Sequence, residues 1–128
     1  FKGEEWRTSK IVSELLAKHF TAQADGIPGN DDTGTMSAWV VFSMMGLYPD
    51  IPGVPEYTLT TPTFDKITIT LNTDYYDNET LVIEKQMSNL NMIKSGEKEL
   101  GYRISHSDLV NSQILHFYIS IKQYILCD

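Results

Sequence analysis

Residues 26–39 read GIPGNDDTGTMSAW, and they are the most informative stretch of the chain. Its first nine residues hold three glycines and a proline, which favour an irregular backbone, around an Asn-Asp-Asp cluster. A mostly apolar segment follows at once. Neighbouring carboxylates repel and perturb each other's pKa, and proteins tolerate that mainly where a site uses it. The stretch therefore predicts a loop that presents Asn30, Asp31 and Asp32 at the start of a buried helix.

A purely structural role is the alternative interpretation of the same acidic residues. Asp32, Thr33 or Thr35 could cap the helix, and acidic side chains suit its positive end. A cap needs neither glycines on both flanks nor three carboxyl or carboxamide groups in a row, so the functional interpretation stays open beside it. A full EF-hand calcium loop is excluded, because Pro28 stands where a ligand should be and no correctly spaced Glu follows.

Length, charge and composition limit the possible classes of protein. The chain has 128 residues, enough for one domain with a core. Seventeen acidic and ten basic residues give a formal charge of −7 without a Lys/Arg cluster, so nucleic acid is not an expected partner. No apolar stretch reaches the ~18 residues that a membrane span needs. The chain lacks an initiator Met, so we expect a piece of a longer protein or a processed form. Its single cysteine, Cys127, cannot form an intrachain disulfide.

Hydrophobic periodicity predicts two helices followed by short strands. Residues 5–20 form an amphipathic pattern, and residues 35–45 are apolar nearly all round, which favours a helix buried on every side. A proline-rich connector follows, and then the period changes to two. Strands are expected at residues 66–71, 80–84, 101–105 and 113–119, with turns at 72–74 and 95–97.

The order of these elements predicts an α+β chain in three parts. We expect helices with the acidic loop over residues 1–48, a connector over 49–62, and an antiparallel, β-sandwich-like region over 63–128. Two helices alone cannot close a core. The apolar helix therefore needs a partner, either further helices of the same domain or a second copy of the chain.

The motif at residues 26–39, followed by Val41-Phe42-Ser43 and Gly46-Leu47-Tyr48-Pro49, closely resembles glycoside hydrolase family 92. These enzymes are calcium-dependent exo-acting α-mannosidases, abundant in gut Bacteroidetes. The resemblance covers about residues 3–110, and residues 104–109 are similar to the family's C-terminal β segment. It implies that the two helices are the last of an (α/α)6 barrel and that the strands form the C-terminal β structure.

The resemblance also implies a chemistry: inverting hydrolysis of α-linked mannose from glycans. Inversion needs a carboxylic acid beside the leaving group and a carboxylate that activates water, roughly 6.5–9.5 Å apart. The resemblance places the base at Asp32, with Asp31 as the next candidate. Asn30 stands where some members carry an assisting aspartate, and an amide could hydrogen-bond the water but not share its proton.

Other parts of the implied site would lie outside this chain. The resemblance places the general acid and most calcium ligands upstream, so we expect calcium as the cofactor and an inactive isolated chain. It also implies a periplasmic, cell-surface or secreted protein. The alternative function is a non-catalytic β-sandwich module that binds carbohydrate or a partner; Tyr75 and Tyr76 beside a turn would suit such a module. Ser105, His106 and Asp108 are not expected to form a triad, because triad members normally meet only in the fold.

Overall fold

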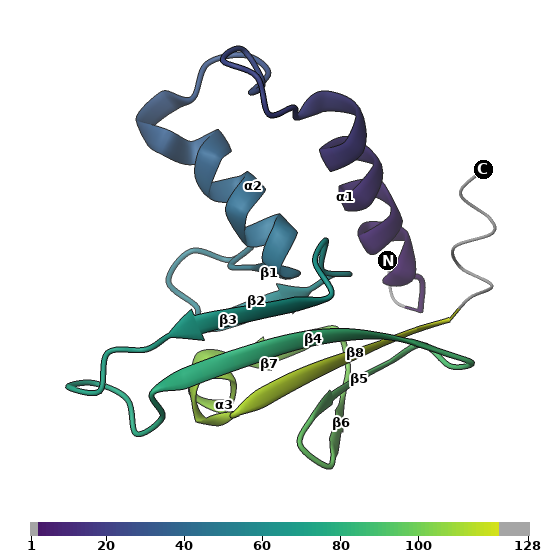
Figure 1. The fold of residues 1–128 in the computed structure, drawn as a ribbon, viewed down its shortest axis with the longest axis vertical. Helices are drawn as coiled ribbons and strands as arrows, with labels where there is room; N and C mark the ends of the chain where they lie inside the picture. Colours follow the sequence, from purple (N-terminus) through teal and green to yellow (C-terminus); the bar gives the residue numbers. More distant parts are fainter. Residues whose placement is uncertain (1–2, 121–128) are drawn as a thin grey trace.

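The computed structural model describes residues 3–120 as two long helices standing against two β-sheets (Figure 1). Helix α1 spans Trp6–His19, and helix α2 spans Thr35–Met45. A short 3-10 turn, η1, precedes α2 at Asp32–Gly34. Both long helices lie where the sequence pattern predicted them, and the α+β class is confirmed.

The two helices are in contact near the end of α1. The rings of Phe20 and Trp39 stack there with centroids 5.5 Å apart. The loop closes on itself, because the Thr21 amide donates to the Gly26 carbonyl at 3.0 Å. A Cβ added to Gly26 would lie only 2.0 Å from the Thr21 oxygen, so this turn requires glycine.

Helix α2 ends at Gly46, where the chain turns into the sheets. Gly46 has a left-handed φ of 78°, and its amide bonds to the Ser43 carbonyl at 3.0 Å. Phe42 and Met45 pack against the core from this end of the helix. The apolar pattern predicted a helix that is buried on every side. Val41 is 56% exposed, so the described residues leave one side of α2 uncovered.

The smaller sheet is antiparallel, in the order β1-β2-β7. Its strands span Leu47–Tyr48, Glu56–Leu59 and Arg103–Ser105. Strand β2 lies inside residues 49–62, where the prolines predicted only a connector. Those prolines flank the strand and leave its four residues free to pair.

The larger sheet has the order β3-β4-β8-β5-β6. Strand β8 pairs parallel to β4, and the other pairs are antiparallel. The expectation of an all-antiparallel region is therefore wrong for the pair β4 and β8. Strands β4 and β5 run in opposite directions, so β8, which lies between them, can be antiparallel to only one of the two. The bounds of the five strands are Lys66–Thr70, Thr80–Ser88, Ile114–Ser120, Met92–Ser95 and Lys98–Leu100.

A short helix, α3, spans His106–Asn111, where the resemblance implied β structure. The Ser105 hydroxyl accepts the Asp108 amide at 3.0 Å and caps this helix, which explains the change from strand to helix. The core lies between the sheets and beneath the end of α2. Its buried apolar side chains form one cluster: Leu47, Leu59, Leu81, Ile83, Ile93, Ile104, Leu109, Leu115, Phe117 and Ile119.

Some sequence-based expectations concern residues outside the part that the structure describes. These residues are 1–2 and 121–128, and the second segment includes Cys127. The three-part division at residues 48 and 62 stays a prediction.

Candidate active site

The acidic loop lies at the end of the helix pair that points away from the sheets (Figure 1). Asn30, Asp31 and Asp32 are all exposed there. Two glycines with positive φ flank them, Gly29 at 73° and Gly34 at 78°. The sequence therefore places the three predicted site residues together, as expected, on a sharply bent loop at the start of α2.

Asp31 is engaged in capping α2. One carboxylate oxygen, Oδ1, accepts the backbone amides of Met36 at 2.8 Å and Ser37 at 3.0 Å. The other oxygen, Oδ2, accepts the Ser37 hydroxyl. The hydrogen bond from that hydroxyl is the main cause that holds the pKa of Asp31 below its usual value, with the two amides helping. Asp32, Thr33 and Thr35 were the capping candidates that the sequence offered; the side chain that binds the amides of the first turn is instead that of Asp31.

Asp32 is held through its backbone and keeps its carboxylate free. Its carbonyl oxygen accepts the Thr35 hydroxyl. Within residues 3–120, no donor or cation lies within bonding distance of its carboxylate. Its neighbour Thr33 has a φ of 56°, which is a strained, left-handed conformation for a β-branched residue. Strain of this kind concentrates at functional sites.

The two adjacent aspartates therefore have different chemical capacities. Asp31 is saturated with donors, which makes it a weaker proton acceptor. The free carboxylate of Asp32 can accept a proton from a water molecule beside it. The Asn30 side chain is exposed on the same loop and offers an amide that could orient such a water.

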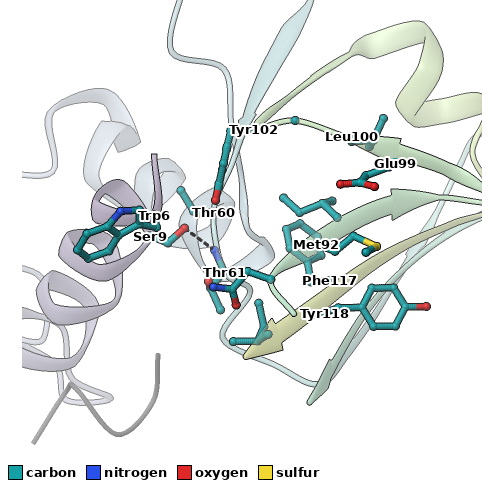
Figure 2. A pocket seen from close by; sticks show the side chains of 14 residues that line it. Trp6, Ser9, Thr60, Thr61, Met92, Glu99, Leu100, Tyr102, Phe117 and Tyr118 are labelled. Carbon is teal, nitrogen blue, oxygen red and sulfur yellow. Dashed lines mark hydrogen bonds between the residues drawn. The ribbon is translucent and has the colours of Figure 1, made fainter. Parts of the chain in front are cut away.

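A first hollow, of about 280 Å³, lies between α1 and the larger sheet (Figure 2). Trp6 and Ser9 of α1 line one side, and Phe117 of β8 lies on the other. The Ser9 hydroxyl accepts the Thr61 amide at 3.3 Å beside it, so this contact ties the start of α1 to the segment that follows β2.

A second hollow, of about 810 Å³, lies between the two helices and the smaller sheet, and Trp39, Tyr48 and Tyr102 line it. At its edge Arg103 pairs with Asp50 at 2.7 Å. Neither hollow is lined by the acidic loop. The predicted site residues are exposed, and none of them lines either of these two hollows.

His106 bridges two tyrosines, a contact that sequence reasoning missed. The Tyr57 hydroxyl lies 3.1 Å from its Nδ1, and the Tyr76 hydroxyl lies 3.4 Å from its Nε2. Since both ring nitrogens face tyrosines and Ser105 caps α3, the Ser-His-Asp sequence forms no triad. The two neighbouring tyrosines differ, because Tyr75 is 80% exposed while Tyr76 turns inward.

The described residues do not by themselves form a metal cage. No group of three His, Cys, Asp or Glu side chains between residues 3 and 120 could hold a metal ion. The described residues alone therefore do not fit the expected calcium ion, whose ligands the resemblance places mostly upstream. Within the same residues, no helix is both long and apolar enough to cross a membrane.

The chain is similar to known glycoside hydrolases. The model of the glycosyl hydrolase family 92 catalytic domain matches residues 1–121. A curated relative, an uncharacterized secreted glycosidase of Arthroderma benhamiae, is 35% identical over 69 residues, which are 54% of this chain and 9% of the relative.

Solved structures share the fold. An inverting mannosidase of family GH92 from Bacteroides thetaiotaomicron VPI-5482 matches with a TM-score of 0.75 and 25% identity, over 93% of this chain and 17% of that one. A family GH92 α-mannosidase from Bacteroides thetaiotaomicron, in complex with mannoimidazole, matches with a TM-score of 0.73 and 24% identity, over 90% of this chain and 15% of that one. The chain therefore spans less than a fifth of the length of these relatives.

Proposed function

The chain belongs to glycosyl hydrolase family 92, and we propose that it forms part of the catalytic domain of an inverting exo-α-mannosidase. The observation that carries the proposal is that the two aspartates of the acidic loop have different hydrogen-bond partners. The Asp31 carboxylate accepts two amides of α2 as a helix cap, whereas Asp32 presents a free carboxylate beside Asn30. The inverting GH92 mannosidase that shares this fold supports the reaction class.

In this proposal Asp32 is the general base. Its carboxylate takes a proton from a water molecule as that water attacks the anomeric carbon of a terminal α-linked mannose. The bond to the leaving oxygen breaks on the opposite face, and a carboxylic acid there protonates the leaving group. Asn30 orients the water by hydrogen bonding and takes no proton. The product leaves as β-mannose, since one displacement inverts the anomeric carbon.

The remaining parts of the site come from elsewhere in the domain. The acidic loop is exposed and lines neither hollow, so the general acid and the sugar pocket require further helices packed beside α1 and α2. Ile11 and Val41, each 56% exposed, offer the apolar surface for that packing. We propose that these further helices complete an (α/α)6 barrel and that their residues supply most of the calcium ligands. A secreted relative supports a periplasmic, cell-surface or secreted location.

A non-catalytic carbohydrate-binding module is the second candidate function. The hollow of about 810 Å³ favours it, because the aromatic rings of Trp39, Tyr48 and Tyr102 line it and could hold a sugar ring. Mannose bound by the purified chain, with no hydrolysis by any longer form of the protein, would favour this candidate.

The experiment that tests the catalytic proposal follows the anomer released. The polypeptide that carries this segment with the rest of its catalytic domain is mixed with an α-linked mannose disaccharide, and proton NMR records the first mannose formed. β-Mannose appearing first supports inversion. α-Mannose appearing first, or no hydrolysis with calcium present, contradicts the proposal.

A further inference from the structure

We propose that the Asp31–Ser37 clamp positions the base, which makes Ser37 a positioning residue for the reaction. The clamp consists of the Asp31 carboxylate together with the amide and hydroxyl of Ser37. This inference rests on the proposed function, in which Asp32 is the general base. Ser37 has no place in the chemistry itself, because its hydroxyl is directed to Asp31.

The clamp fixes the Asp31 side chain in one orientation. Oδ1 takes two backbone amides, from Met36 and Ser37, and Oδ2 takes the Ser37 hydroxyl. With both oxygens occupied from the same turn of α2, the carboxylate cannot rotate without losing at least one hydrogen bond. A helix cap alone would need only the two amides, so the hydroxyl is an additional restraint.

Further hydrogen bonds pass this restraint from Asp31 to Asp32. The Asp31 carbonyl accepts the Gly34 amide at 3.0 Å, and the Asp32 carbonyl accepts the Thr35 hydroxyl. Asp32 thus lies in a closed turn that is tied to α2 on both sides. The left-handed φ of 56° at Thr33 shows that the turn is held against its own conformational preference.

The clamp also separates the roles of two adjacent carboxylates. A base must lie within hydrogen-bond reach of the water, and small displacements of a catalytic group reduce rate steeply. The donors on Asp31 lower its pKa, so it competes poorly for the proton. Loosening the clamp would therefore reduce the rate in two ways: Asp32 would move, and Asp31 would regain proton affinity.

The test uses one variant, one rescue and one matched control in the polypeptide that carries the whole catalytic domain. Ser37→Ala removes the hydroxyl, and Ser37→Thr keeps it. Ser13→Ala makes the same change at an exposed serine of α1. Steady-state hydrolysis of an α-mannoside gives kcat and KM. Amide hydrogen exchange of Met36 and Ser37 gives the second readout, because amides in the first turn of a helix are protected only when a cap binds them.

For Ser37→Ala we expect kcat to fall roughly 10-fold with little change in KM, and exchange at both amides to rise by at least about 3-fold. Ser37→Thr should recover both quantities, and Ser13→Ala should match the wild type. A Ser37→Ala kcat equal to that of Ser13→Ala would overturn the inference, as would unchanged exchange. The proposed function fails separately: it fails if the wild type does not hydrolyse the substrate, or if Asp32→Asn keeps a normal kcat.

Discussion

The backbone amide of Met36 donates a 2.8 Å hydrogen bond to the carboxylate of Asp31, five residues before it in the chain. This contact decides how the acidic loop is interpreted. A pair of adjacent aspartates at a helix start suits either a cap or a catalytic site. The contact assigns the cap to Asp31, and it leaves the Asp32 carboxylate available for chemistry.

The lowered pKa of Asp31 predicts a pH-dependent contribution to stability. A carboxyl whose folded-state pKa is depressed stabilises the fold above its unfolded pKa, about 3.9, and this contribution is lost as the pH falls through the folded value. Asp31→Asn keeps an acceptor for the two amides but loses the charge. We expect its melting temperature to lie below that of the wild type at pH 7, and the difference to vanish well below pH ~4. Thermal melts at several pH values measure this. A constant difference at all pH values would contradict the assignment of the cap.

Adding one methyl group at Gly46, at the junction between α2 and the sheets, is expected to destabilise the fold strongly. Its φ is 78°, and an added Cβ would lie 2.6 Å from the Thr60 carbonyl oxygen. We expect Gly46→Ala to reduce the free energy of unfolding by roughly 2–4 kcal/mol. Gly101→Ala is the matched control, because no atom lies within 4 Å of its added Cβ. Urea denaturation compares the two variants; equal stabilities would show that the turn at Gly46 can rearrange.

The 128-residue chain is predicted to release no mannose by itself. A base without an opposing acid loses leaving-group protonation, an effect of about 10²–10⁴-fold, and the missing sugar pocket costs more. Incubating the purified chain with an α-mannoside, with and without calcium, checks this. Calcium-dependent release of mannose would show that residues 1–128 hold a complete site.

Removal of calcium should separate activity from the stability of this chain. Because residues 3–120 hold no cluster of three metal-binding side chains, a chelator should leave the melting temperature of the purified chain within about 1 °C. Hydrolysis by the complete catalytic domain should be lost with the same chelator and restored by added calcium. A melting temperature that falls on chelation would place a metal site inside the described residues.

Local sequence signals predicted the elements with strong periodicity. The helices at 5–20 and 35–45, and the strands near 66–71 and 113–119, match α1, α2, β3 and β8. Apolar side chains recur along these elements with the period of a helix or of a strand, so the patterns are visible in a single sequence.

Contacts between distant segments could not be predicted in the same way. The parallel pairing of β4 and β8 depends on where β8 inserts, which no local pattern encodes. Strand β2 was hidden by flanking prolines, and α3 depends on a cap at Ser105. In the candidate site the sequence identified the acidic loop but not which aspartate caps the helix. The capping loop also contains Thr33 at a positive φ, a conformation that threonine rarely adopts and that no local pattern encodes.

The role of Asp32 as the base is tested by the kcat of Asp32→Asn in the polypeptide with the complete catalytic domain, measured across a calcium titration. The substitution keeps the side-chain shape but cannot accept a proton from water. If Asp32 is the base, kcat falls by at least about 10²-fold at every calcium concentration while mannose binding changes little. Activity recovered by added calcium would instead make Asp32 a metal ligand. A near-normal kcat would remove Asp32 from the mechanism and contradict the account.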